Sequence, residues 1–266
     1  MRGHLIENDS LVVDLLLHPI LKGCADHRLG AGAPVLCVPG FADAAESWFA
    51  LAEALKDRHC VAVLDLPGFG AAPRLEAGVT VEDFAGRTAA VVRRGWSGPV
   101  TLIGHSLGSV LAVRAAQKLN GQCAAVVSIE GNLTPQDGYF SGQAARHDVP
   151  GAFKDDFSGQ VRRLVEDGRA PASYARSVAV ADSYSMWALG RDADRCGAAD
   201  GFGQEFAALR CPADYLWSRT ATPPATRQYL AKSRPTHHQL TIEHHWPWTI
   251  SPDAVADLVH AAAAPS

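Results

Sequence analysis

The sequence predicts an α/β protein with a mostly parallel, doubly wound sheet. Over the first 130 residues, short apolar runs alternate with amphipathic, helix-like segments. The apolar runs are continuous rather than alternating, as expected for strands that helices cover on both faces. With 266 residues, the chain is long enough for one large domain or two modest ones. In an open sheet of this kind, ligands bind beyond the carboxyl ends of the strands, so we expect the functional site there.

Individual elements follow from these runs and from their flanking residues. Expected strands cover residues 34–38, 60–64, 99–103, 123–129, 212–217 and 239–242. Expected helices of the sheet region cover residues 43–56, 80–94, 107–119 and 252–263. Asp43 and Glu46 have the spacing of a capping box, and Thr80 is a suitable N-cap residue. Ser251 and Pro252 are a typical N-cap and first helical residue.

Between residues 132 and 209 the alternation stops, and we call this stretch the inserted segment. Gly, Asp, Arg and aromatic residues are mixed there, and strand-like runs disappear. Helices are expected at residues 159–167, 172–189 and 203–209. The predicted organisation is therefore a core from residues 1–131 and 210–266, interrupted by a helical cap at residues 132–209.

Composition excludes several classes of protein. The chain has 24 basic and 28 acidic residues and a net charge of −4, which is unlike the basic footprint of a nucleic-acid-binding protein. Apolar runs stay below the roughly 18 residues that a transmembrane helix needs, and acidic residues near Met1 argue against a signal peptide. The six cysteines have wide spacing without a CxxC motif, so we expect reduced thiols, no redox pair, no metal site and a cytoplasmic location. Neither a nucleic-acid nor a membrane partner is expected, and the sequence predicts no oligomeric state.

Residues 104–108 form a G-x-S-x-G pattern centred on Ser106, between an expected strand and an expected helix. A sharp strand-to-helix turn exposes the serine oxygen above the sheet, and Gly104 and Gly108 leave room for that turn. The dipole and free N–H groups of the following helix point to the same place. The alternative interpretation is a serine that caps an ordinary helix.

With these motifs, nearly the whole chain resembles the α/β-hydrolase superfamily, in its capped, epoxide-hydrolase-like and esterase-like branch. Residues 39–41 stand at the family's His-Gly-Phe position, residues 65–70 match its D-x-P-G-x-G turn, and residues 245–247 match its His-Trp-Pro stretch. The resemblance implies an α/β-hydrolase fold with a helical cap and Ser106 as nucleophile. A serine at this place argues against dehalogenase and epoxide-hydrolase chemistry, which need an attacking carboxylate.

Two backbone donors are expected to form the oxyanion hole. One is the N–H of Leu107, the residue after the nucleophile. The resemblance implies that Phe41 supplies the other, and Phe41 can line the pocket as well. The resemblance also implies that His245 is the base. His244 remains an alternative, because the family has Gly before this histidine.

The acid of the triad is not at its usual place. Most of the family has an Asp shortly after the strand at residues 212–217, where this chain has Ala221. Some members carry the acid after the preceding strand, where Glu130 stands 24 residues beyond Ser106. We expect Glu130 to be the acid, with Asp137 as the alternative.

The substrate is expected to be a small molecule with an apolar acyl group, because aromatic residues are frequent in the inserted segment. The alternative is that most of these aromatic side chains form the core of the cap. Candidate pocket residues are Gly40, Trp48, His105, Tyr139, Phe140, Trp187 and Trp246, although His105 is expected to point away from Ser106.

Together these features predict a serine hydrolase that cleaves an ester or thioester through an acyl-enzyme, without a cofactor. Alternatives are an acyltransferase or cyclase, a lyase or carbon–carbon hydrolase, and a non-catalytic ligand-binding protein on the same fold.

Overall fold

A computed structural model describes residues 25–77, 79–198, 201–233 and 236–262. These residues form a seven-stranded sheet in the order β1-β3-β2-β4-β5-β6-β7. Its strands are β1 (Ala25–Leu29), β2 (Ala33–Val38), β3 (His59–Asp65), β4 (Val100–His105), β5 (Cys123–Ile129), β6 (Ala213–Trp217) and β7 (Thr236–Gln239). Neighbouring strands are parallel, except that β1 runs antiparallel to β3. The mostly parallel sheet predicted from the sequence is therefore confirmed.

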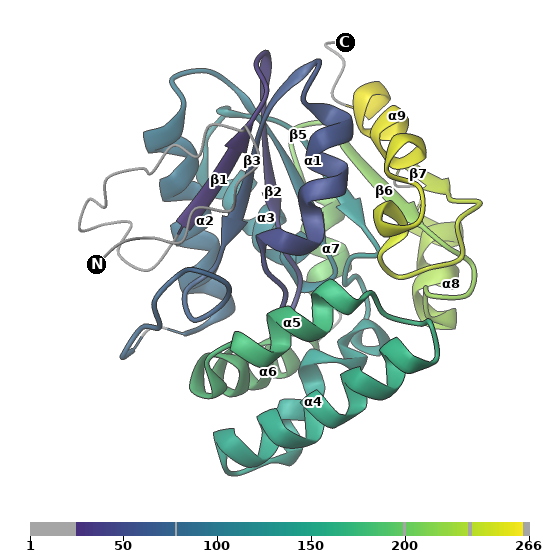
Figure 1. Ribbon diagram of the computed structural model, residues 1–266. Helices are drawn as coiled ribbons and strands as arrows, with labels where there is room; N and C mark the ends of the chain where they lie inside the picture. Colours follow the sequence, from purple (N-terminus) through teal and green to yellow (C-terminus); the bar gives the residue numbers. More distant parts are fainter. Residues whose placement is uncertain (1–24, 78, 199–200, 234–235, 263–266) are drawn as a thin grey trace.

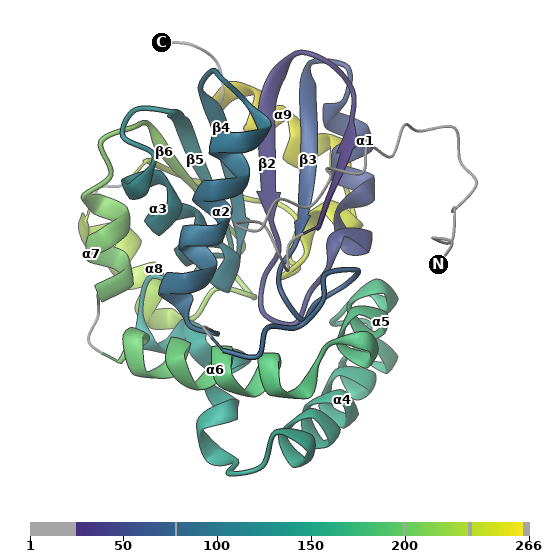
Figure 2. The ribbon, with the colours of Figure 1, turned by 90° about the vertical axis from the view of Figure 1, so that its left-hand side faces the viewer.

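Helices cover both faces of the sheet (Figure 2). α1 (Phe49–Leu55) and α9 (Pro252–Ala262) lie on one face, and α2 (Val81–Gly95) and α3 (Leu107–Lys118) lie on the other. Thr80 caps α2 as expected, because its side chain accepts a hydrogen bond from Asp83 N at 3.1 Å. Acidic residues in the first turn of α2 and basic residues in its last turn complement the helix dipole.

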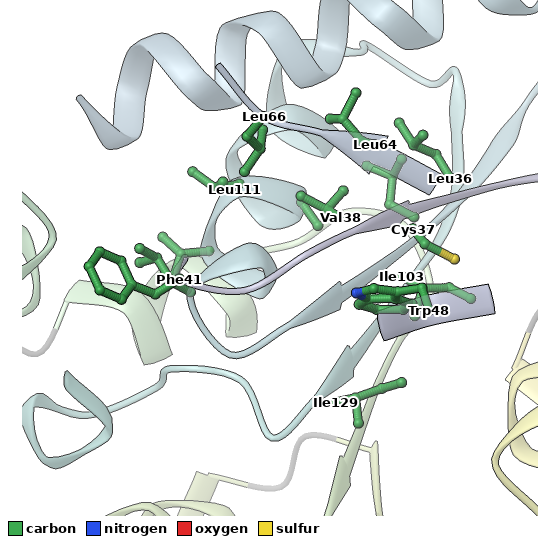
Figure 3. Close-up of a cluster of buried hydrophobic side chains, with 14 of the residues drawn as sticks. Leu36, Cys37, Val38, Phe41, Trp48, Leu64, Leu66, Ile103, Leu111 and Ile129 are labelled. Carbon is green, nitrogen blue, oxygen red and sulfur yellow. The ribbon is translucent and has the colours of Figure 1, made fainter. Parts of the chain in front are cut away.

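The core lies between the sheet and these helices. Figure 3 shows Leu36, Leu64 and Ile103 from three adjacent strands, near Leu111 of α3 and Trp48 of η2 (Ala45–Trp48). All five are 0–1% exposed, which explains why the central strands read as continuous apolar runs.

The inserted segment leaves the sheet after β5 and returns before β6. It contains η3 (Pro135–Tyr139), η4 (Ser141–Arg146), α4 (Pro150–Glu166), α5 (Ala172–Val180), α6 (Ser183–Gly197) and α7 (Gly201–Ala207). Helices α4, α5 and α6 lie together beyond one end of the sheet (Figure 1). That end holds the residues that follow β2 and β3, since Tyr174 Oη donates to Phe41 O at 3.0 Å and Asp182 N donates to Gly68 O at 2.7 Å. The inserted segment therefore packs on the carboxyl edge of the sheet.

Several helix boundaries differ from the prediction. The single helix expected at residues 172–189 is two helices, because Asp182 begins α6 by accepting a hydrogen bond from Ser185 N. The helix expected at residues 159–167 is the end of the longer α4, and the one expected at residues 203–209 is α7. The capping box of Asp43 and Glu46 is wrong, since Asp43 accepts from Ala44 N and Ser47 Oγ.

The edge strands also differ from the prediction. The last strand is β7 rather than residues 239–242, and all of its side chains are exposed. Strand β1 was not predicted, because its sequence ADHRL lacks an apolar run. Edge strands have fewer covered faces than central ones, so apolar periodicity finds them poorly.

Two further findings concern membranes and thiols. Within the described ranges, no helix is long and apolar enough to cross a membrane. Cys37, Cys60, Cys123, Cys196 and Cys211 are free thiols in the structure, whereas Cys24 lies outside the described residues.

Substituting Gly108 tests the packing of the β4–α3 turn. A Cβ at this position would lie 2.2 Å from Val38 O and 2.3 Å from Pro39 O, which are backbone atoms that cannot move aside. We expect Gly108→Ala to lower the free energy of unfolding by about 1–3 kcal/mol in urea denaturation. Gly86→Ala in α2 is the matched control, because a Cβ there meets no atom within 4 Å, and it should stabilise the protein by about 0.5–1 kcal/mol. Equal effects of the two substitutions would contradict this explanation.

Candidate active site

Ser106 stands between β4 and α3 with φ 50° and ψ −126°, a conformation that residues other than Gly rarely adopt. The flanking glycines explain how the chain reaches it. A Cβ at Gly104 would lie 2.4 Å from Ser109 Cα. A Cβ at Gly108 would clash with the carbonyl oxygens of Val38 and Pro39 at the end of β2. The Ser106 side chain makes no capping hydrogen bond to α3, so it is free to face the site. A serine that merely capped the helix would have extended φ and ψ and would bond to its first turn.

Both expected oxyanion-hole residues have their backbone next to Ser106. A Cβ at Gly40 would lie 3.2 Å from Ser106 Cβ, so the chain before Phe41 packs directly against the serine. Leu107 is the first residue of α3, where N–H groups have no partner within the helix. The Phe41 carbonyl oxygen accepts a hydrogen bond from the Tyr174 hydroxyl, which connects this loop to the inserted segment.

His245 reaches the same edge of the sheet and is 8% exposed, like Ser106. Burial lowers the pKa of His245 well below its usual value, and the neighbouring His105 lowers it further. The imidazole is therefore neutral at pH 7, as a general base must be. His244 instead folds its ring onto the next turn, where its Nδ1 lies 3.2 Å from the donor Trp246 N. The geometry therefore favours His245 over His244.

His105 lies beneath His245 and does not face a pocket. Its Nε2 lies 2.8 Å from the His245 carbonyl oxygen, and burial lowers its pKa to about 3. A neutral His105 therefore donates from Nε2 and holds the backbone of His245. Trp48 is fully buried and stacks on Trp248 at 4.5 Å in the same layer. The expectation that His105 and Trp48 line the pocket is thus corrected, because both side chains are buried in the core next to His245 and Trp248.

Glu130 follows β5 with φ 47° and is 5% exposed. Its carboxyl group accepts hydrogen bonds from Ser218 N and from Thr222 Oγ1, the latter at 2.7 Å. These donors flank Ala221, so Glu130 brings a carboxyl group to the loop in which the usual acid is missing. Burial raises the pKa of Glu130 from 4.5 to about 8, and its hydrogen bonds offset only part of that effect.

Asp137, the alternative acid, has a different set of partners. Its carboxyl group accepts from Leu133 N at 2.9 Å, from Thr134 N at 2.8 Å and from Thr226 Oγ1 at 2.8 Å. These bonds close the loop after β5 and join it to α8 (Pro224–Ser233). The geometry therefore favours Glu130 over Asp137 as the acid.

The described side chains do not show an assembled triad. None of their hydrogen bonds joins His245 to Ser106 or to Glu130. The Tyr139 hydroxyl contacts the imidazole instead, at 3.0 Å from Nδ1 and 3.4 Å from Nε2. The hydroxyl can donate to a bare ring nitrogen or accept from a ring N–H. In the tautomer that leaves Nε2 free to act as a base, His245 carries its proton on Nδ1, and the Tyr139 hydroxyl oxygen accepts it. Tyr139 was expected only to line the pocket, and no sequence signal pointed to its contact with His245.

An aromatic layer surrounds His245. Phe140 lies 5.9 Å from the His245 ring and Trp246 lies 4.8 Å from it, measured between ring centroids. Tyr174 packs on Trp246 at 4.6 Å, which ties the inserted segment to this layer. Trp187 is placed elsewhere than expected, because its Nε1 donates to His147 O and its ring lies under Arg191. The surroundings of His245 are therefore mainly aromatic.

The part of the chain that the structure describes holds no cluster of three or more His, Cys, Asp or Glu side chains suited to a metal ion. The groups gathered at this edge are instead a hydroxyl, a neutral imidazole and a buried carboxyl.

Comparison with known proteins identifies the family. The sequence profile described as alpha/beta hydrolase fold matches residues 33–185, more than half of the chain. The chain belongs to the α/β-hydrolase family. The match confirms the resemblance seen in the motifs, and the seven-stranded, mostly parallel sheet agrees with it.

Individual relatives are more distant. A curated protein of Acinetobacter baylyi, (E)-2-((N-methylformamido)methylene)succinate hydrolase, is 33% identical over 82 residues, which are 31% of this chain and 31% of the relative. The chain spans about a third of the length of the curated relatives it matches. A thermophilic esterase from Thermogutta terrifontis superimposes with a TM-score of 0.70 at 22% identity, covering 90% of this chain and 92% of the esterase. A hydrolase from Oleispira antarctica gives a TM-score of 0.73 at 16% identity, covering 92% and 96%. These structural likenesses show the shared fold.

The raised pKa of Glu130 predicts how stability depends on pH. The folded protein holds this proton up to about pH 8, whereas the unfolded chain loses it near 4.5. The contribution of protonated Glu130 to the free energy of unfolding is thus fully present below pH 4.5 and is lost as pH rises toward 8. We expect the free energy of unfolding to fall across this window in wild type and to fall less in Glu130→Gln. Glu243→Gln is the control, because Glu243 accepts from Thr220 N of the same loop but is exposed. Identical pH profiles of wild type and Glu130→Gln would show that the pKa of Glu130 is not raised in the folded protein.

Proposed function

We propose that this chain is a serine hydrolase that cleaves an ester or thioester with an apolar acyl group. Ser106 is the nucleophile, His245 the general base, and Glu130 the acid of the triad. The observation that carries the proposal is the strained, uncapped Ser106, with Gly40 packed against it and Leu107 starting a helix. Backbone strain of this kind is found at functional sites, and here it leaves the Ser106 hydroxyl without a bond to the helix that follows.

The reaction proceeds through an acyl-enzyme. Ser106 Oγ attacks the acyl carbon while His245 takes its proton, and the negative oxygen is stabilised by the N–H groups of Phe41 and Leu107. His245 then protonates the leaving group, and a water molecule releases the acyl group by the reverse sequence. No cofactor takes part in this scheme.

Assembly of the triad requires a small rearrangement. In the structure, Tyr139 occupies Nδ1 of His245, and Glu130 is bonded to the β6–α8 loop. When His245 becomes positively charged, an ionised Glu130 stabilises it better than a phenol does. In our proposal His245 leaves Tyr139 during acylation, and its Nδ1–H turns to Glu130.

The aromatic surroundings support the class of substrate. Phe140 is the half-buried member of the aromatic layer next to His245 and can contact a substrate. The layer behind it is buried and apolar: it includes Tyr174, Trp246 and Phe41. An apolar acyl chain gains free energy by leaving water for such a surface. The Thermogutta terrifontis relative is an esterase, which agrees with this choice.

Covalent labelling tests the nucleophile. A fluorophosphonate should add once to wild type, at Ser106, and turnover of p-nitrophenyl esters should fall by about 10⁴-fold or more in Ser106→Ala. Ser109→Ala is the matched control, since Ser109 lies on the same helix but donates to Gly104 O at 2.7 Å. It should keep both labelling and turnover. A wild-type protein that is neither labelled nor active on esters and thioesters of any chain length would favour a ligand-binding protein.

Kinetics test the acid. Glu130→Gln should lower kcat by about 100-fold or more, while its melting temperature at pH 7 should not fall below that of wild type. Because burial keeps Glu130 protonated up to about pH 8, wild-type kcat/KM should rise with pH through that value. Asp137→Asn is the control, and its melting temperature is measured to separate a loosened loop from lost chemistry. A wild-type kcat in Glu130→Gln would show that Glu130 is not the acid of the triad. A loss of kcat in Asp137→Asn alone would identify Asp137 as the acid.

A further inference from the structure

The strands β5 and β6 bring two cysteines together at the edge of the sheet opposite to Ser106. Cys123 is the first residue of β5, and Cys211 stands two residues before β6. The parallel register pairs Val126 with Ala213, so the two cysteines are near-neighbours at the amino ends of adjacent strands. Their sulfur atoms lie 3.9 Å apart, although the residues are 88 positions apart in the chain.

We propose that Cys123 and Cys211 form a reversible disulfide when the protein meets a peroxide. A disulfide bond is about 2.05 Å long, so the sulfurs must approach by only about 2 Å. Cys211 is half-buried, and the proposal requires rotation of its side chain toward Cys123. Counting back from the pair Val126 and Ala213, Cys211 stands opposite Ala124, one residue along from Cys123. Adjacent strands are about 4.8 Å apart, and disulfides span Cα separations of about 4.4–6.8 Å.

The two thiols differ in a way that gives each a separate role. The contact with the Cys123 thiol lowers the pKa of Cys211 to about 7, because a neighbouring thiol can donate to the Cys211 thiolate once it forms. The same contact and burial raise the pKa of Cys123. Cys211 is also the more exposed of the two, so it is the thiolate that a peroxide reaches first.

The reaction balances with hydrogen peroxide as the oxidant. The Cys211 thiolate attacks one peroxide oxygen, the O–O bond breaks, and hydroxide leaves, giving a sulfenic acid on Cys211. The Cys123 sulfur then attacks the Cys211 sulfur, the S–O bond breaks, and water leaves with the thiol proton. Both cysteines are oxidised by one electron each, and one peroxide is reduced to two water molecules.

This crosslink would enclose the whole inserted segment. Residues 132–209 lie between the two cysteines in the sequence, whereas the bond itself lies at the amino edge of the sheet. A loop of this length is costly to close in the unfolded chain, so the bond stabilises the folded protein.

Peptide mapping tests the proposal on the full-length protein. The protein is reduced, desalted, treated with hydrogen peroxide under native conditions, alkylated and digested with trypsin without a reductant. Trypsin releases Cys123 in residues 119–146 and Cys211 in residues 211–219, each with a single cysteine. We expect these two peptides to be linked, with a mass two hydrogens below their sum, and to separate after reduction. The melting temperature should rise by about 5–10 °C on oxidation.

Variants distinguish this chemistry from general oxidation. Cys211→Ser should prevent both the link and the rise in melting temperature, whereas Cys196→Ser, at another half-buried thiol, should leave both unchanged. In Cys123→Ser, dimedone should trap the sulfenic acid on Cys211, and Cys123→Ala replaces it if the serine variant does not fold. The proposal is overturned if the native protein gives sulfinic acid on Cys211 without the link, or if the link forms only after denaturation.

Discussion

The site depends on the turn from β4 to α3, because this turn sets the direction of the Ser106 side chain. The backbone there is strained at Ser106, and the close approach of Gly104 and Gly108 to neighbouring backbone is what allows the strain to persist. The same approach brings the chain after β2 against the serine, so that nucleophile and expected oxyanion donors are fixed by one set of contacts. Pre-organised donors of this kind need no rearrangement during the reaction, which is the main advantage of building them on rigid elements.

Glu130 follows β5, yet its carboxyl group lies at the loop after β6, where most of the family has its acid. Adjacent parallel strands end at the same edge, so the residue after β5 reaches the loop after β6. Glu130 fills the space beside Ala221 and bonds to Ser218 and Thr222. Because the group is buried, it also makes stability and proposed activity depend on the same proton. The protonated form of Glu130 favours the folded state, whereas the proposed reaction needs the ionised form.

The sequence predicted the parts of the structure in which burial is strongest. The central strands, α2, α3 and the turn at Ser106 were found because continuous apolar runs and glycine spacing reflect packing on both faces. Strands β1 and β7 were missed or shifted because they are the edge strands of the sheet and their sequences are mainly polar. The contact of Tyr139 with His245 joins residues 106 positions apart, and the cysteine pair joins residues 88 positions apart. The first contact depends on how the inserted segment packs and the second on the pairing of β5 with β6, and local patterns encode neither.

The central claim is that Glu130 serves His245 once Ser106 carries an acyl group. A crystal structure of the Ser106 phosphonate adduct tests this most directly, since the adduct mimics the charged tetrahedral intermediate. Our account predicts a Glu130 oxygen within about 2.6–3.2 Å of His245 Nδ1, with Tyr139 displaced and the phosphonyl oxygen bonded to the N–H groups of Phe41 and Leu107. An adduct in which Glu130 keeps only its bonds to Ser218 and Thr222, while Tyr139 still holds His245, would contradict it.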